Sequence, residues 1–135
     1  AVEAVEAFWR LLGMRVLRMD PGRHDRLLAR TSHLPHIVSS ALSAAVGRDG
    51  ESLEGVCGAG LRDTTRVAAG SVDLWRDIAS ANRAALLDEV RACREQLERF
   101  EKALDGADDD ALAALLAAGR AARRRLDREG FGYAE

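Results

Sequence analysis

Three short polar segments hold the residues whose types and spacing could do chemistry. They are His24-Asp25, the cluster Ser32-His33-Leu34-Pro35-His36, and Asp63-Thr64-Thr65-Arg66. His33 and His36 are three residues apart, as metal ligands on one helix face can be, but no third and fourth donors with ligand spacing accompany them. Ser32 lacks the flanking glycines of a nucleophile elbow. The sequence therefore predicts neither a metal site nor a catalytic triad.

Arg66 is the residue most suggestive of ligand binding. Its planar guanidinium suits a carboxylate or a phosphate through paired hydrogen bonds, although a surface ion pair would also account for it. The histidines likewise have a structural alternative. A binding site is favoured by their setting, because Pro35 interrupts a helix that bears Ser32 and His36, and strain combined with polarity is typical of functional sites.

The overall composition excludes several classes of protein. The 135 residues carry 20 basic and 22 acidic side chains, for a net charge of −2, which argues against nucleic-acid binding despite the arginines between residues 120 and 128. No apolar run is long enough to predict a membrane span. Cys57 and Cys93 lack CxxC spacing, so we expect reduced, buried thiols in a cytoplasmic protein.

The N-terminal residues predict a helix followed by a short strand. Apolar residues recur every three or four positions over residues 2–12, and Gly13 ends that helix. Residues 14–19 have strand character, yet no other segment offers a strand to pair with them. A helix followed by a short strand is how an α/β sheet commonly ends, so we expect residues 1–19 to be the last unit of a larger α/β domain, and residues 20–135 to form a helical domain.

The rest of the chain is alanine-rich and predicts an all-α fold. Asp20 should cap a helix over residues 21–46 that bends before Pro35, and shorter helices should follow over residues 61–69 and after Ser71. A long helical hairpin should end the domain. Its first helix carries a heptad-like apolar seam formed by Leu86, Val90, Cys93, Leu97, Phe100 and Leu104. More apolar surface is present than one hairpin can bury, which indicates a homodimer.

Four motifs in order resemble one enzyme family. They are His24-Asp25, the Ser32–His36 cluster, the run from Gly58 to Ala68, and Leu74-Trp75-Asp77-Ile78 with Asn82. Together they are similar to the C-terminal helical domain of prephenate or arogenate dehydrogenases, and the hairpin extends the likeness to residue 128.

The resemblance implies a role in tyrosine biosynthesis. Such enzymes oxidatively decarboxylate prephenate to 4-hydroxyphenylpyruvate, or arogenate to tyrosine, and reduce NAD or NADP. No GxGxxG motif is present, so the resemblance implies that residues 1–19 are the tail of an absent N-terminal dinucleotide-binding domain, which would bind the cofactor. We expect this chain alone to bind no cofactor and to be inactive. By the same resemblance Arg66 would bind a substrate carboxylate and His36 would line the pocket. Ser32, Asp63 and Thr65 would support that pocket, and His33 and Trp75 would shape the pocket or an interface.

A second class of function is compatible with the same residues. This class is a stand-alone helical domain used for dimerisation or small-ligand binding, without catalysis. The presence of His36 and Arg66 favours an intact substrate half, because a purely structural module would have little use for either. Prephenate and arogenate both fit the pattern, as do NAD and NADP, and feedback inhibition by tyrosine is equally open.

Overall fold

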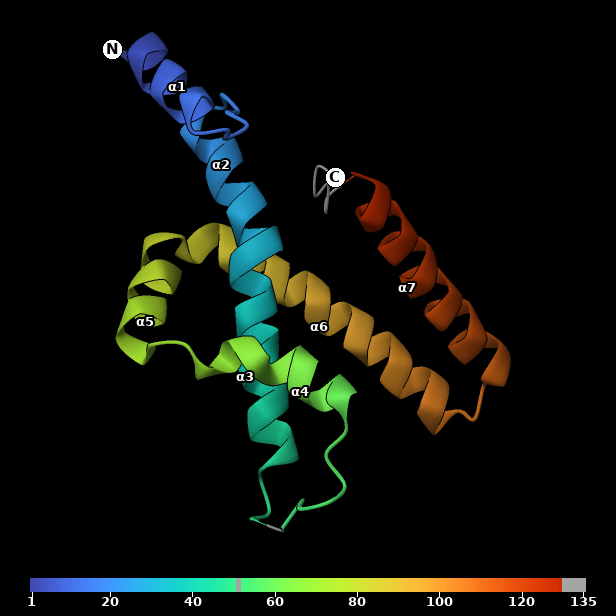
Figure 1. The fold of residues 1–135 in the computed structure, drawn as a ribbon. Helices are drawn as coiled ribbons and strands as arrows, with labels where there is room; N and C mark the ends of the chain where they lie inside the picture. The colour runs from blue at the N-terminus through green and yellow to red at the C-terminus, as the bar shows by residue number, and fades with distance from the viewer. Residues whose placement is uncertain (51, 130–135) are drawn as a thin grey trace. The chain divides into compact units, whose positions relative to one another are not determined.

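A computed structural model describes residues 1–50 and 52–129 of the chain. Its contacts divide the chain into two compact units, Ala1–Leu87 and the residues from Asp88 onward, which are described separately below. Figure 1 shows that the described residues are helices joined by loops. None of these helices is long and apolar enough to cross a membrane.

The first helix, α1 (Val2–Leu11), ends as the sequence predicts, and Gly13 takes a left-handed φ of +78°. The strand expected over residues 14–19 is wrong for this structure, since residues 14–20 have no regular secondary structure. Strand hydrogen bonds need a neighbouring strand, and the described residues contain none. The segment is instead tied to α1 by a two-pronged ion pair between the Arg18 guanidinium and the Glu6 carboxylate.

The long helix expected over residues 21–46 is present in three parts. They are α2 (Pro21–Leu28), a π-helical turn η1 (Ala29–His33) and α3 (Leu34–Val46), and Figure 1 shows them as one column. Asp20 caps α2 by accepting a hydrogen bond from the Arg23 amide, at 2.9 Å. Pro35 has no amide hydrogen to offer to the preceding turn, and the helix widens there, with the Leu34 amide bonded to the Ala29 carbonyl. The sequence predicted a bend at these residues, and the structure has a π turn.

Two shorter helices and one turn pack beside this column. Helix α4 (Ala59–Thr65) continues into the 3-10 turn η2 (Arg66–Ala69), and both lie against α3. Helix α5 (Val72–Ala81) follows, and the Ser71 hydroxyl accepts from the Leu74 amide as expected. These contacts bring the second and third polar segments of the sequence into one unit.

The C-terminal unit contains most of α6 (Arg83–Asp105) and all of α7 (Asp109–Glu129). The turn between them holds Ala107 at a positive φ of 48°, and Asp108 caps α7 through the Ala111 amide. Figure 1 shows the two helices diverging from this turn. Several leucines of the hairpin are exposed, namely Leu97, Leu104, Leu116 and Leu126.

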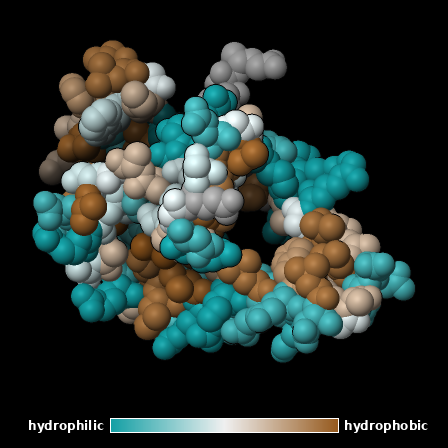
Figure 2. All heavy atoms as spheres, turned by 90° about the horizontal axis from the view of Figure 1, so that it is seen from below, coloured by the Kyte–Doolittle hydropathy of each residue, from teal (hydrophilic) through white to brown (hydrophobic). Residues whose placement is uncertain are grey.

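Few large apolar side chains are buried among the described residues. The buried apolar residues are Ala29, Leu86 and Ala103, whereas the buried polar ones are Glu6, His33, His36 and Ser39. Figure 2 shows apolar residues open to the surface on the face that it draws. Cys57 is also exposed, which corrects the expectation of two buried thiols, because it lies in the loop before α4 and nothing covers it there. Cys93 is half-buried.

Candidate functional site

The site is built on the buried face of the α2–η1–α3 column, where three of the four buried residues are polar and the fourth is Ala29. His33, His36 and Ser39 follow one another at intervals of three residues, and all three are buried. Apolar residues of the same column, such as Leu34, Ile37 and Val38, are only half-buried. A helix that buries histidines in place of its aliphatic residues is unusual for a domain core, and it is typical of a binding-site wall.

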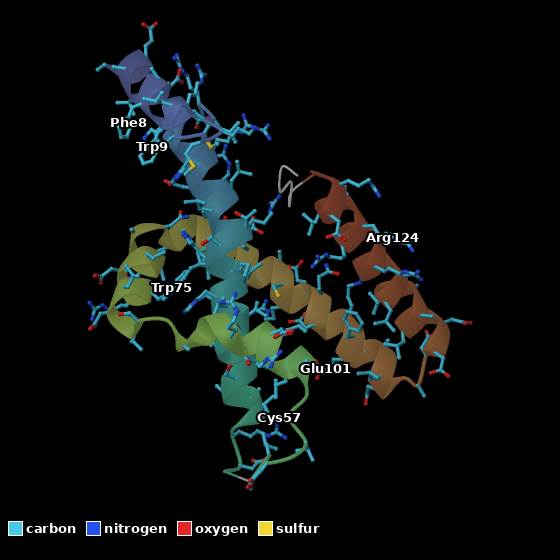
Figure 3. The ribbon with its side chains drawn as sticks, viewed as in Figure 1. Phe8, Trp9, Cys57, Trp75, Glu101 and Arg124 are labelled. Atoms are coloured by element: carbon cyan, nitrogen blue, oxygen red, sulfur yellow. The ribbon has the colours of Figure 1, made fainter. Side chains whose placement is uncertain are left out.

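His36 and Trp75 form the centre of this site. Their rings are stacked with centroids 3.6 Å apart and planes 9° from parallel. Trp75 comes from α5, and Figure 3 shows it between α5 and the column. The backbone of Gly70 lies against both rings, because a Cβ built there would meet Trp75 Nε1 at 2.7 Å and His36 Cε1 at 3.2 Å. A glycine at this position lets the chain pass close to the stack.

A cavity of about 250 Å³ opens beside the stacked rings. Its lining residues come from the column, η2 and α5, and they are Thr31, Ser32, Pro35, His36, Val67 and Trp75. The sequence singled out Ser32, His36 and Trp75, and the structure places these three in one cavity wall. Thr31 and Val67 were not predicted as site residues. Residues four apart lie on the same face of a helix. Thr31 is four residues before Pro35, just as Ser32 is four residues before His36, and this spacing is the signal that could have found Thr31.

Arg66 begins η2, directly before the cavity-lining Val67. Its side chain is exposed, and no described residue forms an ion pair or a hydrogen bond with its guanidinium. The surface ion pair that offered an alternative explanation of Arg66 is therefore not formed within the described residues. The five donor hydrogens of the guanidinium remain available to an anionic ligand.

None of the expected residues Asp63, Thr65 and Arg66 lines the cavity. The Thr65 hydroxyl donates to the Leu61 carbonyl at 2.7 Å, within its own helix. Asp63 is exposed and pairs with the neighbouring Arg62 at 3.2 Å. Both side chains thus make their contacts within α4.

His33 contacts the same tryptophan, Trp75, as His36 does. Its ring meets Trp75 edge to face, with centroids 6.3 Å apart and planes at 82°. Its Nδ1 lies 3.3 Å from the side-chain nitrogen of Asn82. His24 is exposed and pairs with Asp25 at 3.1 Å, away from the cavity lining.

Two buried polar atoms at the site have no hydrogen-bond partner among the described residues. They are Nδ1 of His36 and the hydroxyl oxygen of Ser39. Buried polar atoms are nearly always satisfied by protein, water or ligand, so Nδ1 of His36 marks unused hydrogen-bonding capacity in a residue that lines the cavity, and Ser39 marks it one helical turn further along α3. No group of three or more metal-ligating side chains occurs in the part of the chain that the structure describes.

Comparison with known proteins assigns this helical domain. Residues 20–118 match the family model described as "Prephenate dehydrogenase, dimerization domain". The chain belongs to this family. The match contains every candidate residue of the cavity and most of the helical hairpin.

Curated relatives of the prephenate dehydrogenase family include enzymes of two names. The cyclohexadienyl dehydrogenase of Zymomonas mobilis is 34% identical over 116 residues, which cover 83% of this chain and 40% of that protein. The prephenate dehydrogenase of Bacillus subtilis is 28% identical, with 83% of this chain and 31% of that protein covered. The chain therefore spans less than half the length of these relatives.

Solved structures of the family share the fold. Synechocystis arogenate dehydrogenase is 26% identical with a TM-score of 0.81, covering 92% of this chain and 46% of that one. Prephenate dehydrogenase from A. aeolicus, solved with hydroxyphenyl propionate and NAD+, is 25% identical with a TM-score of 0.82. That comparison covers 93% of this chain and 45% of the A. aeolicus chain. The helical domain described here is thus the fold of the prephenate dehydrogenase dimerization domain.

Proposed function

We propose that this chain supplies the substrate-binding and dimerisation domain of an NAD(P)-dependent prephenate or arogenate dehydrogenase, acting in tyrosine biosynthesis. One observation carries the proposal. The stacked His36–Trp75 pair lines a cavity in the family-matched region. Arg66, whose guanidinium is unpaired among the described residues, is the first residue of η2, and the next residue, Val67, lines the same cavity.

The cavity suits a small cyclic acid. A flat indole and an imidazole offer an apolar, polarisable wall to a six-membered ring, and Ser32 at the rim can bond a hydroxyl or carboxylate oxygen. Arg66 would hold a substrate carboxylate by paired charge-assisted hydrogen bonds. Holding the substrate in one orientation is the main contribution that this domain can make to hydride removal and loss of CO2.

The nicotinamide cofactor has no matching site in the described residues. A dinucleotide pyrophosphate is ordinarily held where a strand passes through a glycine-rich turn into a helix, and residues 1–50 and 52–129 contain no strand. We therefore assign NAD or NADP to a part of the full enzyme outside these residues, in line with the NAD+ held by the A. aeolicus enzyme. By itself the chain should not turn over.

The exposed hairpin supports the dimerisation part of the proposal. Leu97, Leu104, Leu116 and Leu126 are between 47% and 64% exposed, and they occur on the two long helices of one unit. A second copy of the same hairpin is the partner that would cover them symmetrically, as the family description also indicates.

A direct dehydrogenase assay tests the catalytic proposal. The full enzyme carrying these residues and the isolated chain are each supplied with prephenate or arogenate, and with NAD+ or NADP+, and formation of the reduced nicotinamide is followed by absorbance. We expect turnover with at least one of the four pairs in the full enzyme and none in the isolated chain. Absence of turnover with every pair, in a folded enzyme that still binds hydroxyphenyl propionate, would favour the non-catalytic ligand-binding domain instead.

A further inference from the structure

Asn82 joins two helices that are far apart in sequence. It follows α5 directly, and its side-chain nitrogen lies 2.7 Å from the Asp25 carbonyl oxygen of α2 and 3.3 Å from His33 Nδ1. All three residues belong to the first compact unit. The family resemblance included Asn82 as part of a motif but gave it no role.

The contact with Asp25 determines which way the Asn82 amide faces. A backbone carbonyl can only accept a hydrogen bond, so the amide atom 2.7 Å away must be the NH2 nitrogen and not the oxygen. This nitrogen has two hydrogens. One is used by Asp25, and the other is available to the ring nitrogen of His33.

The same reasoning fixes the proton position on His33. An NH2 group has no lone pair to accept with, so Nδ1 of His33 must be the acceptor in this contact. The ring hydrogen of neutral His33 is then on Nε2. This tautomer leaves His33 with a hydrogen-bond donor at Nε2 and with no free basic nitrogen.

We propose that Asn82 is a positioning residue that holds His33 as the Nε2–H tautomer and fixes its ring edge-on to Trp75. The contact chain runs from Asn82 to His33, from His33 to Trp75 at 6.3 Å, and from Trp75 to His36 at 3.6 Å. Through it Asn82 supports the cavity wall without touching the cavity lining. The consequence for substrate binding rests on the proposed function, whereas the tautomer assignment does not.

A purely structural role for Asn82 would also tie the helices together. The Asp25 contact alone could do so, and it would leave the two tautomers of His33 free to interconvert. A change in the proton position on His33 when Asn82 is replaced therefore separates a positioning role from a simple helix tie.

Long-range 1H–15N NMR of the histidine side chains measures this directly. The chain has three histidines, so each ring can be assigned by substitution. At about pH 8, where protein histidines are ordinarily neutral, we expect the wild-type spectrum to show a protonated Nε2 and an unprotonated Nδ1 for His33. His24, whose Nδ1 lies 3.1 Å from the accepting Asp25 carboxylate, should favour the opposite Nδ1–H form in the wild type.

Two substitutions extend the test. Asn82→Asp replaces the NH2 donor by a carboxylate acceptor, so His33 should move its proton to Nδ1. Asn82→Ala removes the donor, and the excess of the Nε2–H form should fall about fivefold, which is the effect of one ordinary hydrogen bond. A wild-type His33 with its proton on Nδ1, or an equal mixture, would overturn the proposal even if both variants failed to fold. A fixed Nε2–H form in an enzyme without dehydrogenase activity would leave this inference intact and remove the proposed function.

Discussion

His36 and Trp75 stack face to face at 3.6 Å, although one lies on the helix after the π turn and the other on α5. The stack joins two motifs that the sequence shows separately. It also forms part of the cavity wall, next to Ser32 and Val67. Substrate binding and domain stability should therefore both depend on Trp75.

Replacing Trp75 by leucine should destabilise the domain. The indole is half-buried between α5 and the column, and loss of its ring contacts should lower the free energy of unfolding by about 1–2 kcal/mol. Urea denaturation followed by circular dichroism measures the change. Trp9→Leu is the matched control, since Trp9 is 45% exposed on α1 and should change stability by less than about 0.5 kcal/mol. Equal losses in the two variants would show that the stack contributes nothing specific.

The hairpin leucines should mediate self-association. Light scattering at micromolar concentration should give twice the chain mass of 14.6 kDa, because the exposed apolar residues of α6 and α7 need a partner. Leu97→Asp should shift the protein toward monomer. Leu97 is 63% exposed within one chain, so its helix content should be retained in circular dichroism. Leu74→Asp, at an exposed position of α5, controls for a general effect of a new charge. A monomeric wild-type protein would contradict the proposed dimer.

Acid should loosen the attachment of residues 14–19 to α1. The hydrogen bond from Arg18, together with the charges of Arg18 and Arg10, lowers the pKa of Glu6 below its ordinary value of 4.5 despite partial burial of the carboxylate. A lowered folded-state pKa means that this stabilisation is fully present above about pH 4.5 and is lost as the pH falls through the folded-state value.

Hydrogen exchange can follow this loosening residue by residue. Protection factors of amides in α1, corrected for the intrinsic pH dependence of exchange, should fall below pH 4.5 in the wild type. In Glu6→Gln they should already be low at neutral pH. Glu3→Gln, in the exposed first turn of the same helix, should behave as the wild type. Identical pH profiles for Glu6→Gln and the wild type would contradict the anchoring role of the pair.

Local signals in the sequence predicted the helices well. Asp20 and Ser71 cap the helices that they were expected to cap, and Pro35 marks the interruption of the long helix. Such features depend on a few neighbouring residues, so sequence alone contains them. The expected strand over residues 14–19 failed because strand formation depends on a partner segment elsewhere, which the described chain does not provide.

The burial of polar residues at the site could not be predicted from the spacing of apolar residues in the sequence. That method assigns the aliphatic residues of a helix to the core, whereas this column buries His33, His36 and Ser39 and leaves Ile37 half-exposed. The cavity also depends on the approach of Val67 and Gly70 to α3, which is a tertiary contact without local signal. Motif resemblance named His36, Ser32, Asp63 and Arg66 alike. Only the structure separates Ser32 and His36, which line the cavity, from Asp63, which pairs with Arg62, and from Arg66, which does not line it.

The kinetics of Arg66→Ala in the full enzyme test most directly whether this domain is the substrate half of a dehydrogenase site. Loss of the paired hydrogen bonds to a substrate carboxylate should cost roughly 2–4 kcal/mol, a 30- to 1000-fold fall in kcat/KM, mainly through a higher KM. Arg76→Ala removes another exposed guanidinium, which pairs with Asp73 and Asp77 among the described residues, and it should leave both constants within about twofold of the wild type. Unchanged kcat/KM in Arg66→Ala, or an equal loss in Arg76→Ala, would contradict the assignment.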